Sequence, residues 1–163
     1  MFDHYSERAR RVVFLARVAA GKRGATYVDT EDLLVALIRE DQRQFLMATR
    51  AMSPGRGSPP PEQAHLPEPF FSEDMAESLL QASEGPPQGP PVPQGTDMPI
   101  SEAMKKALKL AAEIADRHQH KMVQPVHLLA AVVEDREDPL AKLLADHGIN
   151  RRKVKEALDQ SGV

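Results

Sequence analysis

The chain repeats a stretch of its own sequence, since Tyr5–Asp41 aligns without a gap on Ile100–Arg136. Each residue of the first copy is matched by the residue 95 positions later, as Ser6 is by Ser101. Two copies of one unit usually bury a shared core, and the groove between such halves is a natural binding site. The repeat therefore favours a binding module over an enzyme.

Composition favours closely packed helices. Only 4% of the 163 residues are aromatic and none is Trp, so the core must consist mainly of Ala, Leu, Val and Met. The absence of Cys excludes disulfides and thiolate metal sites and favours a reducing compartment. No stretch reaches the ~18 consecutive apolar residues of a membrane helix, and the amino terminus lacks the apolar core of a secretory signal. The sequence predicts a cytoplasmic protein that does not bind a membrane.

Apolar residues recur at steps of three and four, which predicts an all-α fold. Ser6 and Ser101 precede the first apolar stripe of each copy and are the expected N-caps. We expect four helices in each unit. In the first unit they are a helix from Ser6 to about Gly21, then Glu31–Arg39, Gln42–Met52 and Ser72–Ala82; in the second they are a helix after Ser101, then Val126–Glu134, Pro139–Asp146 and Asn150–Gln160.

Pro125 fixes one boundary in both copies. Proline is best accommodated at the first helical position, where no intrahelical amide bond is lost. This makes Gln124 the N-cap, and the register of the repeat then makes Asp29 the N-cap in the first copy. Glu31 would then lie in a first turn, where negative charge is favoured.

Two proline-rich stretches, residues 53–69 and 84–99, separate the helical parts of the chain and hold 12 of its 14 prolines. Such composition favours extended conformations and cannot bury enough carbon to fold. We therefore expect a first repeat over residues 1–83 with an insertion at 53–69, a linker over 84–99 and a second repeat over 100–163. The prolines are either a plain spacer or a ligand for a proline-binding partner.

The segments YSERARRVVFLA and VDTEDLLVALI resemble the duplicated N-terminal domain of the Clp ATPases, the Clp repeat domain, and most of all its ClpC-type members. The resemblance covers nearly all of the chain outside the proline-rich stretches, and it implies a compact all-α fold of two pseudo-symmetric four-helix repeats. In the first copy it rests on Tyr5, Ser6, Glu7, Arg8, Ala9, Ala16, Val28, Thr30, Glu31, Leu33, Leu34, Ala36 and Leu37; in the second it rests on Ser101, Glu102, Ala111, Val123, Pro125, His127, Leu128, Leu129 and Ala131.

The resemblance also implies a function. Domains of this family recruit substrates and adaptor proteins to an ATP-driven unfolding ring, so the expected partners are a Clp-type ATPase, an adaptor or a client polypeptide. The sequence holds no G-x-x-x-x-G-K-[ST] loop, and we expect a stand-alone, non-enzymatic protein that needs no cofactor. The alternative is a regulatory helical domain that binds a small molecule in the groove between the repeats.

The resemblance assigns Ser6, Thr30 and Glu31 to a pocket for phosphorylated arginine on a substrate. A carboxylate suits the guanidinium, while hydroxyls and backbone amides suit the phosphate. The simpler interpretation is that Glu31 only complements the helix dipole. The second copy has Pro125 and Val126 where the first has Thr30 and Glu31, so no equivalent second pocket is expected.

Three histidines, His118, His120 and His127, have spacing that resembles part of a metal site. No fourth ligand lies at a suitable spacing, and His118 and His120 fall in a turn after a helix, so we expect solvated turn histidines there and no metal. Phe70 and Phe71 are either a hydrophobic staple at a helix start or an exposed anchor for a partner.

Neither nucleic-acid binding nor catalysis is predicted. Acidic neighbours and a net charge of −3 offset the basic cluster near the amino terminus, and aromatic residues that could stack on bases are scarce, at 4% of the chain. No nucleophile elbow, zinc-protease motif or paired carboxylates at catalytic spacing occur. The cluster comprises Arg8, Arg10, Arg11, Arg17, Lys22 and Arg23.

Overall fold

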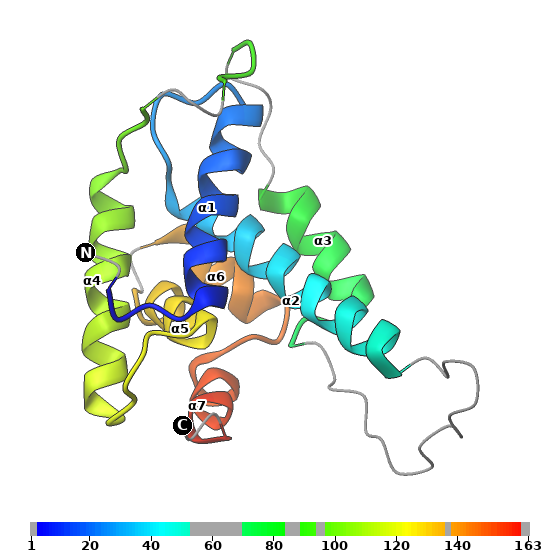
Figure 1. Cartoon of the computed structure of the whole chain (residues 1–163), viewed down its shortest axis with the longest axis vertical. Helices are drawn as coiled ribbons and strands as arrows, with labels where there is room; N and C mark the ends of the chain where they lie inside the picture. Colours follow the sequence, from blue (N-terminus) through cyan, green and yellow to red (C-terminus); the bar gives the residue numbers. More distant parts are fainter. Residues whose placement is uncertain (1–2, 53–69, 84–88, 94–96, 136–137, 161–163) are drawn as a thin grey trace.

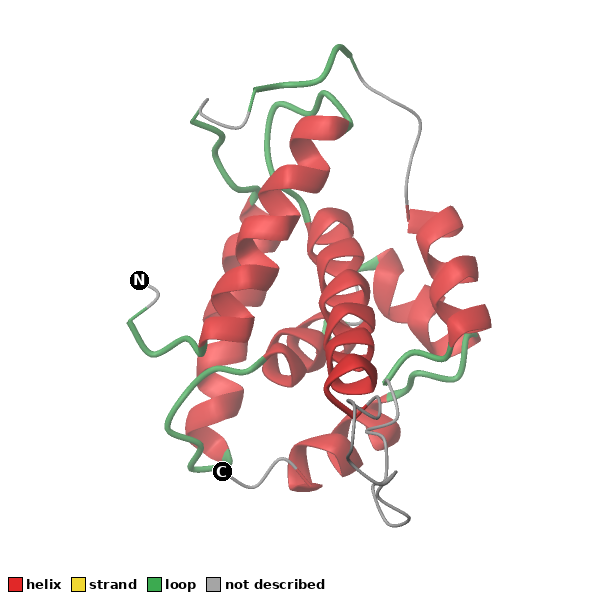
Figure 2. Ribbon diagram, turned by 45° about the vertical axis from the view of Figure 1, so that its right-hand side comes forward, coloured by secondary structure: helices red, strands yellow, loops and turns green. Residues whose placement is uncertain are grey.

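The computed structural model describes residues 3–52, 70–83, 89–93, 97–135 and 138–160. Within these ranges the chain forms seven α-helices and no strand, apart from two isolated β-bridges (Figure 2). The prediction of an all-α fold is confirmed. None of the described helices is both long and apolar enough to cross a membrane.

Helix α5 lies at the centre of the arrangement and contacts α1, α2, α4, α6 and α7 (Figure 1). Helix α3 packs against α2 on the side away from α4. The helices of the first repeat are α1 (Glu7–Lys22), α2 (Thr30–Met52) and α3 (Glu73–Ser83); those of the second are α4 (Glu102–Arg117), α5 (Pro125–Glu134), α6 (Pro139–Asp146) and α7 (Arg151–Gln160).

The expected helix starts are confirmed at the main boundaries. The Ser6 hydroxyl accepts from the Ala9 N–H at 3.1 Å, and the Ser101 hydroxyl accepts from the Met104 N–H at 3.0 Å. Each bond satisfies a first-turn amide that lacks an intrahelical partner. Gln124 is the N-cap of α5, with Pro at the first helical position.

The prediction of four helices in the first repeat is wrong, because α2 runs unbroken from Thr30 to Met52. In the second repeat Pro139 begins a new helix, and the Asp138 side chain caps it by accepting from the Leu140 N–H at 3.0 Å. The corresponding part of the first repeat contains neither Pro nor Gly. The helix therefore continues, and the described part of the first repeat has three helices.

The two repeats exchange the segments that precede their helices. Ser6 N–H donates to the Val123 carbonyl at 3.0 Å, and Ser101 N–H donates to the Val28 carbonyl at 2.9 Å. These bonds belong to two parallel bridges, Tyr5–Val123 and Val28–Ile100. The two bridges are equivalent, because Tyr5 matches Ile100 and Val28 matches Val123 in the repeat. The segment before the first helix of each repeat thus pairs with the segment before the second helix of the other repeat.

One hydrophobic core runs through both repeats, and it includes Val12 and Leu33 of the first and Met104 and Leu128 of the second. Tyr5 crosses between them, since its hydroxyl donates to the Leu108 carbonyl at 3.4 Å. Burial raises the pKa of Tyr5 to about 12. The halves are fused through their apolar faces, as the repeat pattern predicts.

One described part of the linker, residues 89–93, is hydrogen-bonded to the end of α1. Val92 N–H donates to the Gly21 carbonyl at 2.8 Å, and Arg17 Nη2 donates to the Pro93 carbonyl at 3.0 Å. At Gly24, where φ is +68°, an added Cβ would lie 2.4 Å from the Gly89 carbonyl oxygen. Here glycine permits both the left-handed backbone and the close approach of the linker. The expected insertion at 53–69 lies outside the described residues.

Candidate functional site

The structure separates Ser6 from the other two predicted site residues. Ser6 is buried at the start of α1, and its backbone pairs with Val123, which precedes α5 of the second repeat. Thr30 and Glu31 begin α2, beside the start of α4. Because the repeats exchange their first segments, the serine near Glu31 is Ser101.

Asp29 joins Ser101 to the start of α2. Its Oδ1 accepts from the Ser101 hydroxyl at 2.9 Å and from the Thr30 N–H at 2.8 Å. Thr30 is buried and shares a small recess with Ala103 and Lys106 of α4. The first turns of two helices from different repeats are thereby held side by side. A single copy of the repeat carries no signal for this pairing.

Negative charge gathers around Glu31, whose side chain is exposed. Loss of surrounding water and the neighbouring Asp29 raise the pKa of Glu31, while Arg23 opposes the rise. Asp32 and Asp138 add smaller effects that also raise this pKa. Such a negative potential favours a bound cation, and a guanidinium suits a carboxylate geometrically.

Asp32 stabilises the start of α2. Its carboxylate forms a double contact with Arg23, at 2.7 Å and 3.1 Å, and also accepts from the Asp29 N–H at 2.9 Å. Asp32 is buried, so its charge is committed to Arg23 and to the start of α2. Of the first-turn acids of α2, Glu31 is therefore the one that faces solvent.

His127 occupies the position in α5 that Asp32 occupies in α2. Its Nδ1 accepts from the Gln124 N–H at 2.7 Å, so its proton is on Nε2, which faces His120 Nδ1 at 2.7 Å. His127 is fully buried, and burial together with the neighbouring histidines lowers its pKa to about 4.

Both nitrogens of His127 are engaged in these hydrogen bonds, which leaves neither for a metal ion. Across the described ranges, His, Cys, Asp and Glu side chains form no cluster of three or more suited to a metal ion.

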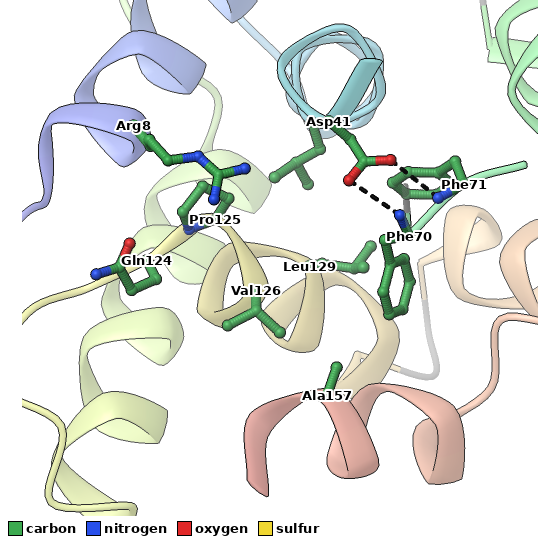
Figure 3. A pocket seen from close by; sticks show the side chains of 10 residues that line it. Arg8, Asp41, Phe70, Phe71, Gln124, Pro125, Val126, Leu129 and Ala157 are labelled. Atoms are coloured by element: carbon green, nitrogen blue, oxygen red, sulfur yellow. Dashed lines mark hydrogen bonds between the residues drawn. The ribbon is translucent and has the colours of Figure 1, made fainter. Parts of the chain in front are cut away.

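A hollow at the junction of the repeats lies near Ser6 and the start of α5, away from Glu31. It is an open groove of about 430 Å³ between α1, α2, α5 and α7 (Figure 3). Arg8, Asp41 and Gln124 supply its polar groups. Its remaining lining is apolar and comprises Leu37, Phe70, Phe71, Pro125, Val126, Leu129 and Ala157.

The adjacent aromatics have different environments. Phe71 is buried in the core, whereas Phe70 is half-buried and lines the groove. Asp41 fixes both, because its two carboxylate oxygens accept from their backbone N–H groups at 3.1 Å and 2.9 Å. Burial raises the pKa of Asp41, an effect that these hydrogen bonds and Arg8 oppose. The sequence predicts a groove between the repeats, but not which residues line it, because the lining comes from both repeats.

The fold is similar to that of Clp N-terminal domains. Residues 99–161 match the family model of the Clp repeat (R) N-terminal domain. The negative regulator of genetic competence ClpC/MecB of Bacillus subtilis is similar along 98% of the chain, with 26% identity. The chaperone protein ClpB of Oceanobacillus iheyensis is similar over the same share, with 23% identity. The chain spans only 17% of the length of each relative.

Solved structures agree with this fold. The N-terminal domain of the chaperone ClpD from Arabidopsis thaliana has a TM-score of 0.60 and 18% identity, and the match covers 99% of this chain and 96% of that one. A chain from structural investigations of a malarial protein secretion system has a TM-score of 0.72 and 17% identity, with 98% and 95% covered.

Proposed function

We propose that this chain is a non-enzymatic module that binds polypeptides and recruits substrates or adaptors for a Clp-type ATPase. The family match and the similarity to Clp ATPases along nearly the whole chain support this role. We further propose that it acts in the cytoplasm without a cofactor. The repeats at 1–83 and 100–163 would act together, since their helix starts pair across the junction.

The observation that carries the proposal is the exposed acidic start of α2. Glu31 stands beside Asp29 and Thr30, and the Asp29–Ser101 hydrogen bond ties this turn to the other repeat. We propose that Glu31 binds a guanidinium group on a client, such as a phosphorylated arginine. Thr30 remains a candidate, and Ser101 takes the place of Ser6.

Calorimetric titration of the chain with a phosphoarginine peptide tests this site. Because charge-assisted hydrogen bonds are about twice as strong as neutral ones, Glu31→Gln is expected to weaken binding about tenfold. Glu73→Gln removes an equivalent first-turn acid from α3 and is expected to leave affinity unchanged. Equal affinity of the wild type and Glu31→Gln would exclude the site.

A second candidate function is the binding of a small molecule between the repeats. The groove of about 430 Å³ supports it, because its lining is mainly apolar and does not include Glu31. A compound that raises the Tm of the wild type, but not of Val126→Trp with its narrowed groove, would favour this function.

A further inference from the structure

We propose that the groove between α1, α2, α5 and α7 is a second polypeptide site, which takes an extended segment with an apolar side chain next to an Asp or Glu. This inference rests on the proposed role in polypeptide binding but concerns a site other than Glu31. Its basis is a reversal of charge between the two repeat junctions.

The two junctions differ at two matched positions. At the start of α2 the carboxylate is Glu31, and the facing residue on α4 is Ala103, which shares a recess with Thr30. At the start of α5 the residue matched to Glu31 is Val126, while the residue matched to Ala103 is Arg8. At these two matched positions, one junction thus has a carboxylate and no arginine, and the other has an arginine and no carboxylate. The first suits a cationic group, and the second suits an anionic one.

The charge of the Arg8 guanidinium is only partly balanced by neighbouring carboxylates. Its nearest carboxylate, Glu40, lies 3.6 Å away, and the same Glu40 oxygen already accepts from Arg11 at 2.9 Å and from Gln44 at 3.0 Å. The Arg8 side chain is 44% exposed. Asp41 also lines the groove, but both of its oxygens accept backbone N–H bonds. Arg8 is therefore the group best placed to meet a ligand carboxylate.

The layout of the groove fits an extended segment. Arg8 and Gln124 lie at one end, Phe70 lies at the other, and Val126 and Leu129 lie between them (Figure 3). The amino-terminal end of α5 also borders this groove, and its dipole favours a nearby anion. If a ligand carboxylate binds Arg8, the neighbouring residue of the ligand would thus lie in the apolar part of the groove. That order predicts an acidic side chain adjacent to an apolar one.

Fluorescence anisotropy with labelled peptides tests the preference. The probes are three Gly/Ser-flanked peptides with the central sequences Leu-Leu-Glu, Leu-Leu-Gln and Leu-Leu-Lys. We expect the glutamate peptide to bind about tenfold more tightly than the glutamine peptide, with the lysine peptide weakest. The preference should shrink at high salt, because half-exposed charges are screened. Equal affinity for the three peptides would overturn the proposal.

Two variants and a matched control locate the effect. Arg8→Gln should reduce binding of the glutamate peptide to that of the glutamine peptide, whereas Arg10→Gln, on the exposed face of the same helix, should not. Val126→Glu should reverse the order in favour of the lysine peptide. It introduces an acid in a first turn, where helices tolerate it well. Equal losses in Arg8→Gln and Arg10→Gln, or an unchanged order in Val126→Glu, would contradict the assignment.

The outcome separates this inference from the proposed function. If phosphoarginine peptides bind through Glu31 while the Leu-Leu-Glu peptide does not bind, only the groove assignment fails. If neither class of peptide binds, the function as a polypeptide-binding module fails as well. Binding of the Leu-Leu-Glu peptide that Glu31→Gln leaves unchanged supports two distinct sites.

Discussion

Replacement of Glu40 by alanine is expected to lower the free energy of unfolding by about 3 kcal/mol, the lower end of the range for a broken buried ion pair. The Glu40 side chain is 0% exposed and receives the Arg11 guanidinium at 2.9 Å. Arg8 lies 3.6 Å away and Arg43 3.9 Å away. Alanine would remove the buried carboxylate that these cations share and open a cavity in the packing between α1 and α2. Because the arginines are partly exposed, water would relieve part of the cost.

Urea denaturation measures the effect of Glu40→Ala, since the midpoint and slope give the free energy of unfolding. The matched control is Glu7→Ala, which removes a carboxylate that is 91% exposed and lies 3.5 Å from the same Arg11. That variant should lose at most about 0.5 kcal/mol, because exposed ion pairs contribute little. Similar losses in the two variants would show that burial does not govern this network.

Acidification is expected to destabilise the protein through His127. Its pKa is lowered from 6.5 to about 4 in the folded chain, mainly because the side chain is buried. Between these values the unfolded chain binds a proton that the folded chain does not, so stability falls as the pH drops from 6.5 to 4. The shift corresponds to a loss of about 3 kcal/mol, complete near pH 4.

The free energy of unfolding, measured across this pH range, tests the prediction. The free energy of unfolding of His127→Gln should depend less steeply on pH than that of the wild type, because the contribution of His127 is removed. Its stability at pH 7 will be lower. His4→Gln, which replaces an exposed histidine, should keep the wild-type slope. An identical pH dependence in His127→Gln and the wild type would contradict the assignment to His127.

Local patterns predicted the helices well, because helix starts depend on nearby residues. Ser6 and Ser101 cap as expected, and Pro125 fixes the start of α5. The predicted break after Arg39 was wrong because the second copy has a proline there and the first does not. A repeat transfers the helical pattern from one copy to the other, but not each boundary.

Features that join the repeats could not be predicted from either copy alone. The exchange that places Ser101, rather than Ser6, beside the start of α2 depends on backbone bonds between residues far apart in sequence. The burial of His127 likewise depends on how α5 packs at the centre of the fold. Sequence reasoning identified Thr30 and Glu31 as candidates and predicted a groove between the repeats, but it had no basis for placing Arg8 in that groove.

Polypeptide binding is tested most directly by titration of the full chain with an unfolded protein, reduced and carboxymethylated α-lactalbumin, and with its native form. We expect saturable binding of the unfolded form and no binding of the native one, because only an unfolded chain offers extended segments to the junctions between the repeats. Failure to bind the unfolded form would contradict the proposed function.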